Sequence, residues 1–260
     1  MSERLLVGIE FTASELRIAL AESDGERVAH ERWPLPASPA LADDEAWAWE
    51  VGGRIATTFA ELGAGRSALA IAVAAPGAVD PIAGRLLRGG QPEWEGLAVV
   101  EALRRHIDAP AAVESRVRAA LLGEQLQGAA RGVDSVLYLS LRGEPEAALL
   151  LGGRALRGAQ GEAGALPAVP ELDPEERLGG EALEAVAGPL ADAAALLDPE
   201  LVVVDAHPRH LETLLPVLRR MIAEVAPGPR VEPAALGADA ALAGALQIAA
   251  TLAYEAGIEA

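Results

Sequence analysis

Short apolar runs alternate with longer mixed stretches along most of this 260-residue chain. Continuous runs of Ala, Val, Ile and Leu, such as ALAIAVAAPG at 68–77 and LVVVD at 201–205, are typical of strands buried on both faces. The longer stretches between such runs favour helices. The pattern predicts strands at 5–11, 16–23, 27–35, 68–77, 111–115, 135–141, 146–156 and 201–205, and helices at 44–62, 97–106, 116–127, 181–197, 208–224 and 238–256.

Both halves of the chain follow the same order of elements. Each half begins with strands joined by turns and continues into an alternation of strands and helices, which predicts two similar α/β lobes with a cleft between them. We expect an N-terminal lobe at 1–114, with 245–260 packing back onto it, and a C-terminal lobe at 115–244. Acidic residues open the first helix and suit its dipole, and Gly188-Pro189 is expected to break the helix at 181–197. The acidic residues are Asp43, Asp44 and Glu45.

Composition excludes several classes of protein. No apolar run approaches the roughly 20 residues that span a bilayer, and the start MSERLLVGIEF does not resemble a signal peptide. We therefore expect a cytoplasmic protein without a membrane partner. There are no cysteines, which excludes disulfides and thiolate metal sites. The net charge of −18 argues against nucleic acid as a partner.

Two residue types that handle phosphates and sugars are missing. The chain contains no Lys and no Asn, and its 21 basic residues are all Arg. No Lys can therefore hold a phosphate as a point charge, and no Asn side chain can hold a sugar hydroxyl or Mg²⁺.

Seven segments, in order along the chain, resemble the ROK family of bacterial sugar kinases, sugar-responsive repressors and unassigned relatives. GIEFTASELRIAL resembles the family's GxDxGGTxxRxAL-like segment, and VESRVRAALLGEQLQGAARG resembles its VENDxxxAALGE…GAARG pattern. The resemblance implies an α/β protein of the actin-like ATPase (ribonuclease H-like) fold and a homodimer. The segments lie at 8–20, 72–87, 91–103, 113–132, 137–166, 196–206 and 237–246.

The resemblance fails at the first phosphate turn. Family kinases use glycines there so that the backbone can approach a phosphate. Thr12 and Ala13 stand in those places, and the acidic residue before them is Glu10 instead of Asp. Ser14 keeps a hydroxyl, but Glu15 adds negative charge near the expected phosphate.

The second phosphate turn also departs from the family. Its G-T-G-x-G sequence is replaced by Arg142-Gly143-Glu144-Pro145-Glu146, in which the proline lacks an N–H donor and two carboxylates face the expected polyphosphate. Arg142 could in principle bind an anion. The family's glycine pair near the adenosine is replaced by Asp205-Ala206.

The catalytic position is lost as well. The family's Asn-Asp pair orients a sugar hydroxyl and takes its proton, and Ser115 and Arg116 stand in its place. Arginine stays protonated and cannot act as a base. Glu114 is expected to point to the other face of its strand, away from this role.

The sugar-recognition loop is similarly changed. Ala165 and Ala168 stand where the family carries Glu and His, its cysteine-rich zinc motif is absent, and the stretch 166–196 is shorter than in the family. We therefore expect no structural zinc, and no ATP or Mg²⁺ unless the chain is a divergent kinase. The remaining candidates for ligand binding are Gly77, Ser115, Arg116, Glu162 and Gly164.

Other residues of the resemblance have a structural interpretation. Pro76-Gly77 and Val79-Asp80 shape a turn, and Trp94 is expected to pack in the core or between the lobes. His207 and His210 could suggest a metal pair, but their spacing favours the start of a surface helix.

Four functions fit these observations. The first is a pseudokinase-like binding or scaffold protein, and the second is a sensor of a sugar, or of an anionic ligand such as a sugar acid or phosphosugar, that uses Arg116 and Ser115. The third is a structural partner of an active paralogue, and the fourth is a divergent glucokinase-like enzyme that transfers ATP phosphate to a hexose. A repressor is not expected, because the GIE strand begins at residue 8 without a helix-turn-helix before it. We favour a non-catalytic protein with a small-molecule-binding or scaffold role, which includes a regulatory one.

Overall fold

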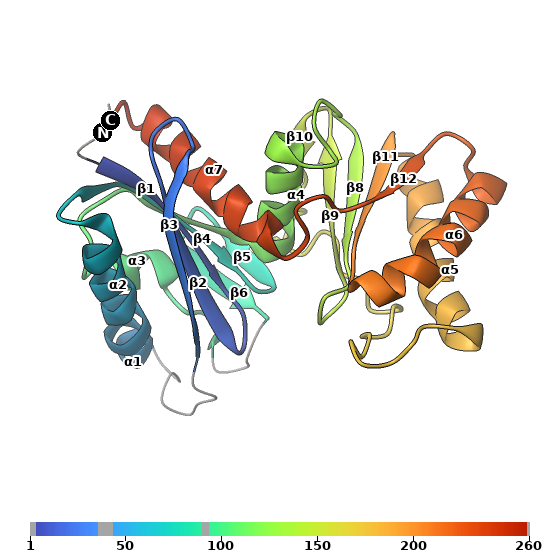
Figure 1. Cartoon of the computed structure of the whole chain (residues 1–260), viewed down its shortest axis with the longest axis horizontal. Helices are drawn as coiled ribbons and strands as arrows, with labels where there is room; N and C mark the ends of the chain where they lie inside the picture. The colour runs from blue at the N-terminus through green and yellow to red at the C-terminus, as the bar shows by residue number, and fades with distance from the viewer. Residues whose placement is uncertain (1–3, 36–43, 90–93, 259–260) are drawn as a thin grey trace. The chain divides into compact units, whose positions relative to one another are not determined.

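The structure, a computed structural model, describes residues 4–35, 44–89 and 94–258 and forms two compact units. Unit 1 comprises Met1–Gly123 and Ala241–Ala260, and unit 2 comprises Glu124–Ala240. The boundaries predicted from the sequence were 114/115 and 244/245. Figure 1 shows each unit as a sheet with helices packed on it. Asp43 and residues 91–93, named in the sequence analysis, lie outside the described residues.

Unit 1 is built on a five-stranded sheet. Its strand order is β3-β2-β1-β4-β7, in which β1, β2 and β3 pair antiparallel while β4 and β7 run parallel to β1. A separate two-stranded ribbon pairs β5 with β6. The strands are β1 (Arg4–Phe11), β2 (Glu15–Ala21), β3 (Arg27–Pro34), β4 (Ser67–Ala75), β5 (Ala78–Asp80), β6 (Arg85–Arg88) and β7 (Ala111–Ser115).

Alternate side chains of β1 enter two different cores. Val7 and Ile9 belong to the core that also contains residues of the first helices, whereas Leu6 packs in a core with Leu246 of α7. Gly8 faces α7 at close range, because a Cβ there would lie 2.8 Å from Cγ of Leu246. The helices of this unit are α1 (Asp44–Trp47), η2 (Ala48–Gly52), α2 (Gly53–Gly63), α3 (Val99–Arg104) and α7 (Ala240–Glu255), with α4 (Arg116–Gln127) contributing residues to both units.

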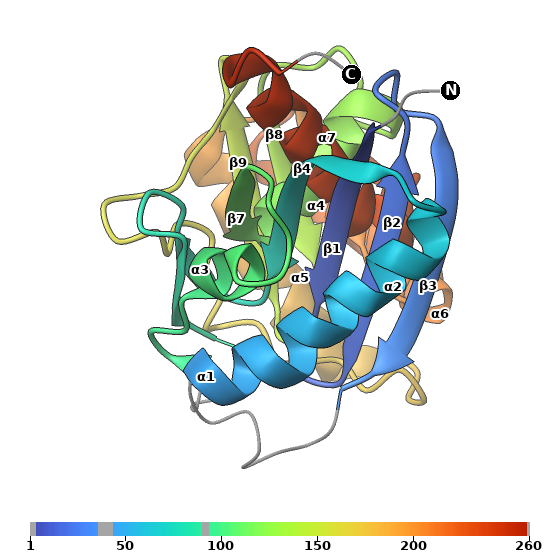
Figure 2. The same cartoon turned by 90° about the vertical axis from the view of Figure 1, so that its left-hand side faces the viewer.

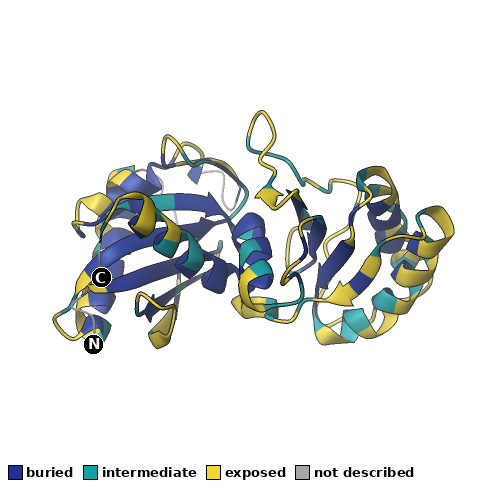
Figure 3. Ribbon diagram, turned by 90° about the horizontal axis from the view of Figure 1, so that it is seen from above, coloured by how far each residue is buried: buried dark blue, intermediate teal, exposed yellow. Residues whose placement is uncertain are grey.

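Unit 2 repeats the topology of unit 1. Its strand order is β10-β9-β8-β11-β12, again with antiparallel pairs on one side of the first strand and parallel strands on the other. Helices α5 and α6 share one core with the sheet, whose strands are largely buried (Figure 3). The elements are β8 (Val136–Ser140), β9 (Glu146–Leu151), β10 (Arg154–Ala155), α5 (Gly180–Leu197), β11 (Leu201–Asp205), α6 (Pro208–Val225), β12 (Arg230–Pro233) and the 3₁₀ turn η4 (Gly237–Asp239).

Two predictions about local structure were wrong. Helix α5 continues through Pro189, because the apolar residues on both sides of the proline are buried on one face and hold the helix against the sheet. The strand predicted at 146–156 is a hairpin, because Gly152 and Gly153 adopt φ values of 56° and 74° and turn the chain between β9 and β10. Among the described residues, no helix combines the length and the apolar character that crossing a membrane requires.

Candidate functional site

Glu10 lies at the carboxyl end of β1, where the family resemblance places the first phosphate turn. Its side chain is buried, and Oε2 lies 3.0 Å from Nη1 of Arg17, its cross-strand neighbour on β2. Burial raises the pKa of Glu10 above its ordinary value, and the guanidinium groups of Arg17 and Arg116 oppose that rise. Glu10 is therefore a buried acid that forms an ion pair with Arg17, on the neighbouring strand.

The turn that follows Glu10 is closed by Thr12. Its Oγ1 accepts hydrogen bonds from the backbone N–H groups of Ser14 (3.3 Å) and Glu15 (3.1 Å). The N–H of Thr12 donates to the carbonyl of Glu15 at 2.8 Å. Backbone N–H groups are the donors with which a glycine-rich turn binds phosphate. In this chain three of them already have acceptors within the turn.

Ser115 and Arg116 lie where β7 ends and α4 begins. Ser115 is buried, and its Oγ accepts from the N–H of Arg118 at 3.4 Å, as a residue before a helix commonly does. Arg116 is half-buried and close enough to Glu10 to act on its pKa. Two of the changed positions, Glu10 and Arg116, therefore lie within electrostatic range of each other.

Glu114 precedes the two positions where the resemblance expects the family's Asn-Asp pair. It is 3% exposed, and its Oε1 accepts from Nε of Arg118 at 2.7 Å and from the N–H of Ser115 at 2.8 Å. Glu114 is thus part of a buried ion pair at the start of α4, and a kinase base must instead reach a substrate hydroxyl.

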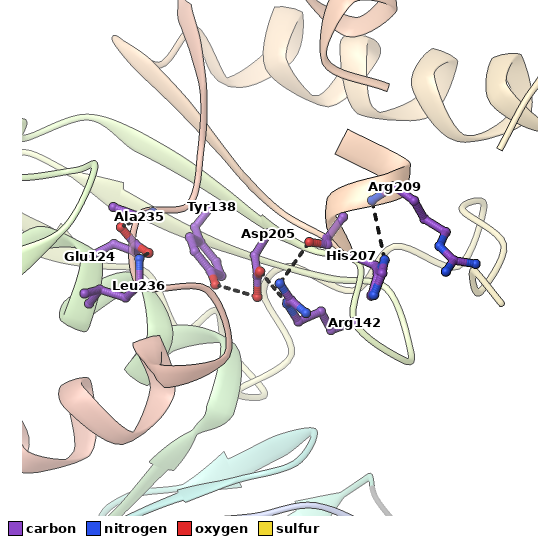
Figure 4. Close-up of polar contacts among 9 residues, drawn as sticks. Glu124, Tyr138, Arg142, Asp205, His207, Arg209, Ala235 and Leu236 are labelled. Atoms are coloured by element: carbon purple, nitrogen blue, oxygen red, sulfur yellow. Dashed lines mark hydrogen bonds and ion pairs between the residues drawn. The ribbon is translucent and has the colours of Figure 1, made fainter. Parts of the chain in front are cut away.

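A second charged group lies at the carboxyl edge of the sheet in unit 2 (Figure 4). Nε of Arg142, just after β8, lies 2.6 Å from Oδ1 of Asp205, the last residue of β11. Nη2 of Arg142 donates to the carbonyl of Ala206 at 2.9 Å, and the hydroxyl of Tyr138 donates to Oδ2 of Asp205 at 3.3 Å. Two departures from the family pattern, Arg142 and Asp205, therefore bind each other.

The rest of this edge is also hydrogen-bonded. The N–H of Leu141 donates to the carbonyl of Asp205 at 2.7 Å. Gly143 adopts φ of 87° in the turn after Arg142, and the Glu144 side chain is exposed. These contacts fix the chain at the place where the resemblance expects a nucleotide phosphate.

His207 and His210 serve the start of α6. Nδ1 of His207 accepts from the N–H of Arg209 at 3.4 Å, and the buried ring of His210 bonds to the carbonyl of Glu176 through Nε2 at 3.1 Å. No cluster of three or more potential metal ligands occurs among the described residues. The pair lies at the start of α6, as expected, although His210 is buried and does not lie on the surface.

Three of the ligand-binding candidates have clear local roles or positions. Gly77 adopts φ of 71° beside Arg88, where a Cβ would overlap the carbonyl oxygen. Gly164 adopts φ of 105°, and its carbonyl accepts from the N–H of Ala147 at 2.7 Å. Glu162 is half-buried in the same loop. Gly77, Ser115 and Arg116 belong to unit 1, whereas Glu162 and Gly164 belong to unit 2.

Sequence reasoning missed several residues that shape these sites. Arg17 could have been found from the hairpin, because residues that flank a tight turn face each other across the strands. Tyr138 carries no such signal, since its contact with Asp205 joins residues 67 positions apart. The expectation that Trp94 packs in a core is confirmed, because it is fully buried with its ring centroid 5.4 Å from that of Phe11.

Comparisons with known proteins identify the family and the fold of this chain. A sequence model of the ROK family matches residues 6–180, which is more than half of the chain. The chain belongs to the ROK family. A search of curated protein sequences finds no match.

Solved structures of ROK proteins share the fold. The ROK hexokinase from Thermus thermophilus matches with a TM-score of 0.75 and 23% identity, covering 96% of this chain and 99% of that one. The ROK glucokinase from Streptomyces griseus, in complex with glucose and AMPPNP, matches with a TM-score of 0.76 and 19% identity over 95% and 99% of the two chains. A ROK transcriptional regulator, a homologue of the E. coli MLC protein, matches with a TM-score of 0.78 and 18% identity over 97% and 79%. The chain therefore has the actin-like ATPase fold of these ROK proteins.

Proposed function

We propose that this ROK protein is non-catalytic and has a small-molecule-binding or scaffold role. The observation that carries the proposal is the ion pair between Arg142 and Asp205, at 2.6 Å. It joins the two turns where family kinases place glycines, so Arg142 is already bound to a carboxylate and a carbonyl of the protein. A polyphosphate would have to compete with Asp205 for this guanidinium and would also approach its negative charge.

The charges in unit 1 support the same proposal. Arg116 occupies the place of the family's base and acts on Glu10 instead of accepting a proton. Loss of a general base alone slows a reaction by about 10²–10⁴-fold. Thr12 further reduces the capacity of the first turn to bind phosphate, because its hydroxyl occupies the N–H groups of Ser14 and Glu15.

Titration calorimetry with ATP–Mg²⁺ and AMPPNP–Mg²⁺ tests the proposal, followed by an assay for phosphate transfer to glucose. We expect neither binding nor transfer. Nucleotide binding together with transfer would overturn the proposal and establish the alternative, a divergent glucokinase-like enzyme. A variant that carries Arg142→Gly and Asp205→Gly removes the ion pair and restores one of the family's glycines at each of the two turns. It should bind nucleotide more tightly than the parent chain, provided that its melting curve remains cooperative.

A panel of neutral sugars and sugar acids then separates the two non-catalytic roles. A saturable shift of Tm with one of these compounds would support a small-molecule sensor, because a ligand that binds the native state stabilises it. If no compound of the panel shifts Tm, the result would favour a scaffold role. The proposal also includes a homodimer in the cytoplasm, and sedimentation equilibrium measures the mass of the assembly directly.

A further inference from the structure

A pocket in unit 1 is lined by none of the residues described in the candidate functional site. It has a volume of about 630 Å³ and is lined by α1, by η2 and by residues just after α3. Its lining includes Glu45, Trp49, Glu50, Arg105 and His106. Pockets of roughly 300–1,000 Å³ are typical of sites for small molecules. The size therefore suits a small ligand.

The walls of the pocket are joined by hydrogen bonds at two points. Oδ1 of Asp44 accepts from the N–H of Ala98 at 2.9 Å, where α3 is about to begin. Nε2 of His106, beyond the end of α3, bonds to the carbonyl of Ala48 at 2.8 Å. Figure 2 shows α1 and α3 side by side. The pocket is consequently formed in advance of any ligand, which lowers the entropic cost of binding.

The helix that forms one wall has an unusual turn. Residues Ala48–Gly52 form a π-helix, in which the N–H of Gly53 reaches the carbonyl of Ala48. Gly52 allows His106 to approach, because a Cβ there would lie 3.1 Å from Cδ2 of the ring. Single π-helical turns inside α-helices occur frequently at functional sites.

Trp49 is the exposed aromatic residue of this wall. Its side chain is 76% exposed, whereas Trp33, Trp47 and Trp94 are at most 4% exposed. An indole ring offers a large apolar face and attracts cations through its π-system. Trp49 therefore provides a stacking surface that the fold does not use.

The polar groups of the pocket select for positive charge. Glu45 and Glu50 are both exposed, and Arg105 is bonded to Glu101 through Nη2 at 3.3 Å. The carbonyl of Ala48 can only accept, so Nε2 of His106 donates to it. The pocket lining therefore holds two exposed carboxylates, and its arginine is paired with a carboxylate outside the lining.

We propose that this pocket binds a small organic cation that carries an apolar group. The ammonium or guanidinium group would lie against Glu45 and Glu50, and the apolar group would stack on Trp49. This binding does not depend on the proposed loss of phosphate transfer, because none of these residues belongs to the turns of the phosphate site.

The tryptophan fluorescence of the intact chain tests the proposal, because Trp49 is the exposed fluorophore. Phenethylamine, phenethyl alcohol and 3-phenylpropionate share an aromatic body and differ in charge, so they serve as probes at constant ionic strength. We expect a saturable change with the amine and none with the alcohol or the carboxylate. Equal responses to the amine and the alcohol, or no saturable response to the amine, would overturn the proposal.

Two double variants locate the binding. Glu45→Gln with Glu50→Gln should weaken amine binding about tenfold, since two charge contacts are removed. Glu31→Gln with Glu61→Gln changes the net charge of the chain by the same amount at exposed residues outside the pocket lining, and should leave the affinity unchanged. Equal weakening by both pairs would refute a local site. Calorimetry with Trp49→Ala, whose affinity should also fall, supplies a readout that does not depend on fluorescence.

Discussion

Arg142 and Asp205 lie 63 positions apart in the sequence, yet Nε of the arginine is 2.6 Å from Oδ1 of the aspartate. They meet because β8 and β11 are neighbouring parallel strands, with Ser140 opposite Asp205 in the register. Asp205 is 4% exposed, so its charge needs partners within the protein. Arg142 and Tyr138 supply them.

This pair should be measurable as a coupling energy. Arg142→Gln and Asp205→Asn should each destabilise the chain, and the double variant should lose less than the sum of the two. Because the Arg142 side chain is 31% exposed, we expect a coupling of about 1–2 kcal/mol, below that of a fully buried pair. Urea unfolding of the four proteins measures the coupling. As a comparison, Arg220→Gln removes an exposed pair with Glu224 and should change stability by less than about 0.5 kcal/mol. Strictly additive effects at Arg142 and Asp205 would show that the two side chains do not interact in solution.

Glu10 should make stability depend on pH. Burial raises the pKa of Glu10 in the folded state. At a pH between the ordinary glutamate pKa of about 4.3 and this raised pKa, the folded chain therefore binds a proton that the unfolded chain has released. The contribution of this protonation of Glu10 to stability is therefore fully present below the ordinary pKa, and it is lost as the pH rises through the folded pKa. Glu10→Gln, which is neutral at every pH, should be more stable than the parent at pH 7, and the difference should vanish toward pH 4.

Urea unfolding between pH 4 and pH 8 tests this expectation. The exposed variant Glu31→Gln serves as a control and should track the parent across the range. If Glu10→Gln were instead less stable than the parent at pH 7, the ion pair with Arg17 would outweigh the cost of burial.

Glu124 should be needed for the stability of unit 2. It is fully buried, and its carboxylate accepts from the N–H groups of Ala129 (2.7 Å), Ala235 (3.1 Å) and Leu236 (2.7 Å). Glu124→Gln places an amide NH₂ against at least one of these donors, and should lower the free energy of unfolding by about 2–3 kcal/mol.

Thermal and urea unfolding check this prediction. Gln127→Ala alters an exposed residue of the same helix and should change stability by less than about 0.5 kcal/mol. If the two variants lose a comparable free energy of unfolding, the loss in Glu124→Gln would come from a change in the helix and not from the three hydrogen bonds.

Gly164 should tolerate no side chain. Its φ is 105°, and a Cβ would lie 1.8 Å from the carbonyl oxygen of Ala147. We expect Gly164→Ala to cost about 2 kcal/mol or more in urea unfolding, because backbone strain and overlap act together. Gly228→Ala is the matched control, since nothing lies within 4 Å of its Cβ position and its φ is not in the left-handed region. If both alanine variants keep the stability of the parent, backbone strain and overlap at position 164 do not destabilise the chain.

The sequence by itself determined most of the elements and the family. Continuous apolar runs such as 68–77 and 201–205 become central parallel strands, since strands covered on both faces need apolar residues at every position. The motifs also predict that Arg116 stands where the family carries a base, and residue identity alone decides that an arginine keeps its proton.

Only the tertiary structure decided what the changed residues contact. Arg142 pairs with Asp205, and Glu10 pairs with Arg17, because strand order and register bring separate segments to one edge of a sheet. The continuity of α5 through Pro189 likewise depends on packing against the sheet, which local helix propensity cannot predict. Local patterns specify elements through burial and backbone geometry, whereas charge pairing depends on distances that exist only once the chain is folded.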